Sequence, residues 1–170
     1  MKEEVIELDT VDKYNKFFGV ETYHPMVTVV DLSKITQPAQ PFTINYGIYA
    51  LFLKDTLCGD ITYGRQPYDY QEGTIVCFAP GQVASIHAQE GTRPTGYGLL
   101  FHPDFIRGTQ LGHDIRNYSF FSYEAREALH LSEEERHTVI DCLHKSDTEL
   151  RRPADKHSRR LITANIGLLL

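Results

Sequence analysis

The sequence has few cysteines, and they follow no pairing motif. Cys58, Cys77 and Cys142 are odd in number, lie far apart and include no Cys-x-x-Cys pair. Disulfide frameworks of small secreted domains use even sets of cysteines, and zinc knuckles use closely spaced pairs. The sequence therefore argues against both kinds of cross-link and predicts a protein of the reducing cytoplasm.

Long hydrophobic runs are also absent. No apolar stretch approaches the roughly 18 residues that a helix needs to cross a bilayer. The start Lys2-Glu3-Glu4 is acidic, whereas an export signal begins with a basic segment followed by an apolar core. The sequence predicts a protein that is neither exported nor embedded in a membrane.

Positive charge is in deficit. The chain has 17 Lys and Arg against 23 Asp and Glu, which gives a formal net charge of -6. Nucleic-acid affinity depends mainly on cations that neutralise phosphates, so this chain itself is not expected to bind DNA. One basic cluster stands beside many acids in a helical stretch and is interpreted as a solvated face: Arg151, Arg152, Lys156, Arg159 and Arg160.

What remains is ordinary globular composition with a β-rich middle. The chain has 170 residues, 41% hydrophobic and 24% charged, which suits one folded domain. A helix is predicted over residues 10–18, with Thr10 as N-cap and Gly19 as the stop. Runs rich in Val, Ile, Tyr, Phe and Thr then predict strands near residues 26–32, 44–54, 58–63, 68–71, 74–78, 83–88 and 96–102.

Connections between these strands are too short for crossover helices, so an antiparallel barrel or sandwich is expected. Helical patterns return afterwards. Ser132 and Glu135 form a capping box, and apolar stripes follow in two helices. The predicted fold class is mainly β with C-terminal helices, divided into an arm with a short helix (1–25), a barrel (26–103) and a helical segment (104–170).

The chain ends at Leu170 inside the last apolar pattern, without a Gly or Asn cap or a following proline. This ending predicts that the 170 residues are a piece of a longer protein.

A resemblance to known families enters at residues 69–87. This stretch, with Glu72-Gly73 before a strand and Pro80-Gly81 turning the chain back, resembles the second conserved motif of cupins. Together with residues 46–54 before it and 96–104 after it, the order is similar to the N-terminal arm of AraC-type transcription regulators. Residues 117–124 and 128–132 resemble a subgroup common in gut Bacteroidetes, and the likeness covers nearly the whole chain.

The resemblance implies a cytoplasmic bacterial regulator with a cupin-like jelly-roll barrel. Such a barrel senses a small molecule, for example a sugar or another metabolite, and the two amphipathic helices after it pair two subunits into a homodimer. DNA would be bound only by a following domain of about a hundred residues with two helix-turn-helix motifs, which is absent from this sequence.

The first cupin motif lacks the residues of a metal centre. A catalytic cupin needs two His at i and i+2 and a nearby Glu to hold Fe(II), Mn(II) or Zn(II). Residues 59–66 contain no His, and Tyr63 and Arg65 stand about where that pair would be. We therefore expect no metal, no cofactor and no enzymatic activity. The alternative is a stand-alone metal-dependent cupin enzyme, an isomerase or dioxygenase, with His87 as one ligand.

A barrel without metal is free to bind an effector through a few polar groups. The candidates are Lys54, Arg65, Tyr49, Tyr97 and His87. The resemblance places Lys54 near a position where a basic residue often meets the effector, although a slip of one residue would turn it to solvent. The competing interpretation makes Lys54 part of a polar turn, pairs Arg65 with a surface acid and treats the tyrosines as ordinary barrel aromatics.

The helical stripes suggest a subunit interface, a core against the barrel, or both in part. The residues predicted to mediate dimerisation are Val139, Leu143, Leu161, Ile162, Leu168 and Leu169. His130, His137 and His144 recur every seven residues, which predicts a polar helix face, because helical chelation favours a spacing of four. A purely structural dimerisation domain with a collapsed barrel and no effector also stays open.

Overall fold

The structure is a computed structural model of the 170-residue chain. It describes residues 4–36, 41–54, 59–63, 66–68, 74–88, 95–118, 121, 129–152 and 157–170.

Ten described strands form two five-stranded sheets, each with non-sequential neighbours. The first sheet has the order β1 (Val5–Leu8), β3 (Phe42–Tyr46), β8 (Gln82–Ala88), β5 (Gly59–Tyr63) and β6 (Gln66–Tyr68). The second sheet has the order β10 (Leu129–His130), β7 (Thr74–Phe78), β4 (Tyr49–Lys54), β9 (Gly96–Phe101) and β2 (Val27–Asp31).

The predicted fold class is confirmed at the coarse level: two largely antiparallel sheets precede C-terminal helices. The predicted closed barrel is not confirmed, because the described strands pair into two separate sheets. An all-antiparallel arrangement is also wrong, since β1 pairs with β3 in parallel. β1 lies in the region predicted as an arm, where four residues are too short to give a strand signal.

The predicted strand over residues 44–54 is in fact two strands in different sheets. The chain turns at Gly47, where an added Cβ would stand 2.6 Å from the Cα of Asp9, and the Gly47 N–H donates to the Leu8 carbonyl at 2.9 Å. Only a residue without a side chain allows this close approach of two backbone segments. The break places β3 in the first sheet and β4 in the second.

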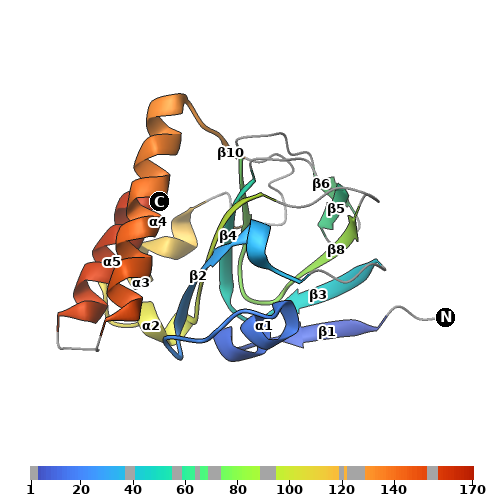
Figure 1. Ribbon diagram of the computed structural model, residues 1–170, viewed down its shortest axis with the longest axis horizontal. Helices are drawn as coiled ribbons and strands as arrows, with labels where there is room; N and C mark the ends of the chain where they lie inside the picture. The colour runs from blue at the N-terminus through green and yellow to red at the C-terminus, as the bar shows by residue number, and fades with distance from the viewer. Residues whose placement is uncertain are drawn as a thin grey trace.

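The second sheet is buried on both faces. Residues of even number, such as Ala50 and Phe52, contribute to the cluster between the two sheets. Their odd-numbered neighbours Leu51 and Leu53 join a second cluster under the helices. Figure 1 shows the resulting layers, with α4 and α5 on one side of the second sheet and the first sheet on the other. Two buried faces explain why β4 reads as a continuous apolar run.

Helices cover both clusters. α1 (Val11–Phe18) has the predicted Thr10 cap and left-handed Gly19 end, and it packs Tyr14 and Phe18 into the cluster between the sheets. The helix-side cluster is covered by α2 (Pro103–Ile106), α3 (Gln110–Asp114), the 3-10 turn η2 (Ile115–Asn117), α4 (Glu133–Arg151) and α5 (Ser158–Leu169).

The α4 capping box of Ser132 and Glu135 is present as predicted. A second 3-10 turn, η1 (Leu32–Lys34), follows β2. Among the described helices, none has the length and apolar character required to span a membrane.

Candidate functional site

Lys54 lies on the face of β4 that looks toward the first sheet. It is the last residue of the strand and shares the phase of Ala50 and Phe52, which belong to the cluster between the sheets. Its Nζ stands 5.3 Å from the centroid of the Phe52 ring, and its side chain is half-buried. The pleat therefore places this cation at the end of the inter-sheet row, not in a turn directed to solvent.

The two candidate tyrosines lie on the opposite face of the same sheet. Tyr49 stacks on Phe101 with ring centroids 5.2 Å apart and meets Phe121 edge-on at 5.2 Å. Burial raises the pKa of the Tyr49 phenol. Tyr97 meets the exposed His144 of α4 edge-on at 5.3 Å. Both tyrosines thus contact the helical layer, and the structure does not bring them to Lys54.

His87 lies on the outer face of the first sheet. It is exposed, and it alternates with Ala84 and Ile86, whose side chains pack between the sheets. The prediction that His87 joins Lys54 in one pocket is therefore wrong, because the two side chains lie on different faces of different sheets. Arg65 lies outside the described residues.

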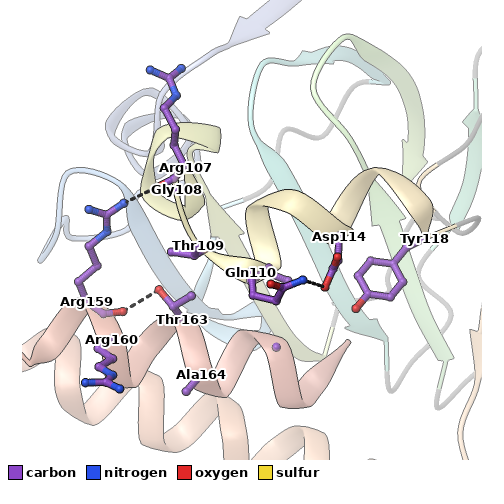
Figure 2. A pocket seen from close by; sticks show the side chains of 12 residues that line it. Arg107, Gly108, Thr109, Gln110, Asp114, Tyr118, Arg159, Arg160, Thr163 and Ala164 are labelled. Carbon is purple, nitrogen blue, oxygen red and sulfur yellow. Dashed lines mark hydrogen bonds between the residues drawn. The ribbon is translucent and has the colours of Figure 1, made fainter.

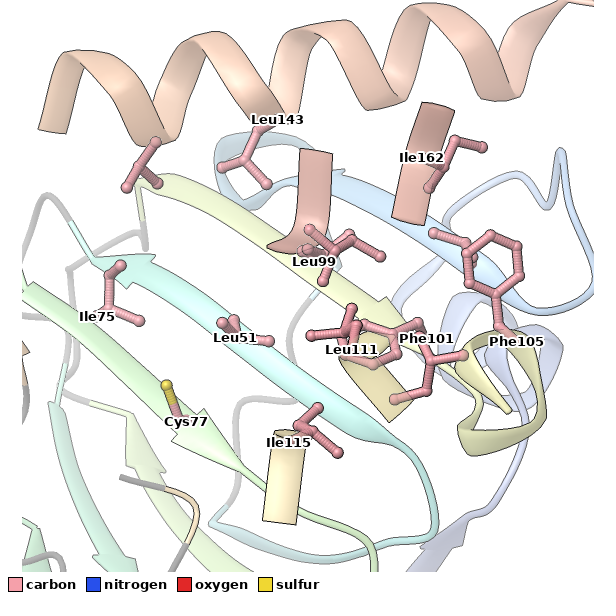
Figure 3. Close-up of a cluster of buried hydrophobic side chains, with 14 of the residues drawn as sticks. Leu51, Ile75, Cys77, Leu99, Phe101, Phe105, Leu111, Ile115, Leu143 and Ile162 are labelled. Carbon is pink, nitrogen blue, oxygen red and sulfur yellow. The ribbon is translucent and has the colours of Figure 1, made fainter. Parts of the chain in front are cut away.

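The residues predicted for dimerisation divide into two groups. Val139, Leu143 and Ile162 are buried in the helix-side cluster, and Figure 3 shows Leu143 and Ile162 reaching from the helices toward the sheet. These three side chains serve the core of their own chain, so they are not on the surface. Leu169 is partly buried against the same cluster, whereas Leu161 and Leu168 are exposed by 51% and 68%.

The predicted stripe of three histidines on one helix does not form. His130 belongs to strand β10, and only His137 and His144 are in α4, where both are exposed. The strand ends just before the Ser132 cap, so the seven-residue spacing crosses an element boundary. In the part of the chain that the structure describes, no cluster of three His, Cys, Asp or Glu could hold a metal ion.

A cavity that the sequence did not reveal lies between α5 and the α2–α3 segment. Its volume is about 630 Å³, and Figure 2 shows Arg159, Thr163 and Ala164 from α5 on one side of it. Thr109 and Asp114 line the other side. These walls are about fifty residues apart in sequence and carry no shared motif. Arg159, interpreted from sequence as part of a solvated face, is exposed and also donates to main-chain carbonyls of the α2 region.

A second unpredicted feature joins the N-terminal segment to α4. The Arg151 guanidinium lies 4.5 Å from the Tyr23 ring centroid and donates to its hydroxyl at 3.0 Å. Asp147 accepts from the same guanidinium at 3.1 Å. Together with Tyr97 and His144, these residues line a polar cavity of about 410 Å³. The contact spans 128 positions of sequence, so no local pattern could indicate it.

Comparisons with known proteins give no further identity: no family model matches this chain, and no curated protein is significantly similar to it.

Because side chains of β4 alternate between two faces, substitutions at neighbouring positions should have very different effects on stability. Leu53→Lys would put a charge into the cluster under the helices, where Leu53 is 2% exposed, and should lower the free energy of unfolding by about 3 kcal/mol or more. Lys54→Leu should change it by about 1 kcal/mol or less, since the inter-sheet side beside Phe52 accepts an apolar side chain. Urea unfolding of both variants measures the contrast. Equal losses would show that the phase of β4 is assigned wrongly.

Proposed function

We propose that this chain is the effector-sensing and dimerisation domain of an AraC-type transcription regulator of the bacterial cytoplasm. In this proposal the two sheets are the halves of a cupin-like jelly roll, and DNA is bound by a further helix-turn-helix domain outside these 170 residues. The observation that carries the proposal is the position of Lys54, a half-buried cation directed to the inter-sheet side of an otherwise apolar strand.

A cation at that position favours an effector with a negative or strongly polar group. A ligand pocket typically combines apolar walls with a few directed polar groups. Phe52 and the neighbouring inter-sheet side chains supply the apolar part, and the Lys54 ammonium supplies a charge-assisted donor. We therefore propose a sugar acid or a similar small metabolite as the effector, bound where the row of inter-sheet side chains ends.

The rival function, a stand-alone metal-dependent cupin enzyme, is less well supported. It requires the second-motif histidine to face the space between the sheets, where the metal ligands of a cupin converge. His87 has the opposite phase to Ala84, which is fully buried between the sheets. A shift of one residue in β8 would be needed to bring the imidazole inside, and it would expose Ala84 and Ile86 instead.

Dimerisation in this proposal rests on the outer face of α5. Leu161 and Leu168 are seven residues apart and exposed. This spacing matches the seam of a two-stranded coiled coil. A twofold pairing of two α5 helices would bury the same stripe on both subunits.

The effector site is tested by thermal unfolding with galacturonate and glucuronate. A ligand that binds only the folded chain at about a hundred times its Kd adds about 2.7 kcal/mol, so Tm should rise by several degrees. Lys54→Met should abolish the shift, while Lys34→Met, at an 81% exposed lysine, should retain it. A shift that survives in Lys54→Met would contradict the proposed site, and no shift with either acid would contradict a sugar-acid effector.

The subunit interface is tested by size-exclusion chromatography with light scattering. The wild-type chain should give twice its mass of 19.5 kDa. The double variant Leu161→Glu/Leu168→Glu should give a monomer, because paired stripes would place like charges together. Lys16→Glu, at a 77% exposed lysine of α1, should remain dimeric as the control. A monomeric wild type at high concentration would overturn this part of the proposal.

A further inference from the structure

The cavity between α5 and the α2–α3 segment has the composition of a ligand site. Its volume of about 630 Å³ falls in the range of sites for small metabolites. Leu111, Tyr118, Ala164 and Gly167 supply an apolar lining, and three arginines face a single aspartate among the charged lining residues. Figure 2 shows Arg107 and Arg159 at the end opposite Asp114 and Tyr118.

Arg159 is held in place by neutral groups. Its Nε donates to the Phe105 carbonyl at 3.0 Å, and its Nη2 donates to the carbonyls of Arg107 at 3.1 Å and Asp104 at 3.4 Å. Main-chain carbonyls fix the guanidinium plane without cancelling its charge. A guanidinium has five N–H groups, and these three bonds leave the two on Nη1 for another acceptor. Arg159 is thus a positioned cation with donors to spare.

Of the other charged residues of the cavity, Arg160 adds positive charge to this end, and the Arg107 charge is offset by a neighbouring carboxylate. Arg107 is paired with Asp104, which does not line the cavity, and the two groups are 2.5 Å apart. Arg160 follows Arg159 on α5 and is exposed. Asp114 lies at the far end and accepts a hydrogen bond from Gln110 at 2.8 Å. The arrangement complements a molecule with a carboxylate at one end and an apolar body beside Leu111 and Tyr118.

We propose that this cavity binds a small organic carboxylate with an apolar or aromatic body. Arg159 and Arg160 would receive the carboxylate, as planar guanidinium groups favour planar anions. The bound molecule would bridge α5 to the α2–α3 segment, because each contributes one wall. The site is separate from Lys54 and goes beyond the proposed function: it holds whether or not the inter-sheet site binds an effector.

The proposal is tested with phenylpropionate and its neutral amide, phenylpropionamide, by calorimetric titration of the wild-type chain. The acid should bind, and the amide should bind at least about tenfold more weakly, since charge-assisted hydrogen bonds to the guanidinium are lost. Arg160→Gln should weaken the binding of phenylpropionate by a similar factor. Equal affinity for acid and amide, or no binding of the acid, would overturn the proposal.

Substitutions at Gly167 locate the bound acid without harming the fold. A Cβ at Gly167 meets no atom within 4 Å, and a larger residue is a better helix former than glycine. Gly167→Leu should fill the cavity and abolish binding with an unchanged or higher Tm, whereas Gly167→Ala should keep binding. Lys54→Met should also keep it. Binding that persists in Gly167→Leu but disappears in Lys54→Met would place the acid between the sheets and refute this site.

Discussion

The burial of the second sheet on both faces is the constraint on which the rest of the structure depends. The central strands β4 and β9 are covered by the first sheet on one face and by the helical layer from α2 to α5 on the other. Strand alternation then assigns every residue to one of two apolar layers. Leu53 must face the helices, and Lys54 must face the first sheet. The position of the candidate effector site is therefore a consequence of how the core is divided.

The same constraint limits what the C-terminal helices can offer to a partner. Since α4 and α5 cover one face of the sheet, Leu143 and Ile162 are used within the chain. Only the outer stripe with Leu161 and Leu168 is left for a second subunit. One side of α5, from Arg159 to Gly167, also forms a wall of the arginine-lined cavity. Core packing and both proposals, subunit pairing and carboxylate binding, thus involve a single twelve-residue helix.

Features with a local cause could be predicted from the sequence. Strand β7 has the predicted bounds. Thr10 and the Ser132 capping box begin their helices, and Gly19 ends α1, as expected. Features that depend on distant contacts could not. The break at Gly47 follows from the approach of Asp9, and β1 pairs with β3 in parallel. An amphipathic stripe likewise does not tell whether Ile162 contacts a sheet or another subunit. The sequence around Arg159 also does not indicate that its guanidinium donates to main-chain carbonyls about fifty residues away.

Hydrogen exchange of individual backbone amides tests the central claim most directly. Amides of a strand covered on both faces should exchange only when the whole chain unfolds. The account predicts the slowest exchange in β4 and β9, and faster exchange in β1, which lies at an edge of the first sheet. If β4 exchanged as fast as β1 while α4 stayed protected, the helices would not cover the second sheet, and the assignments of Leu53 and Lys54 would fail together.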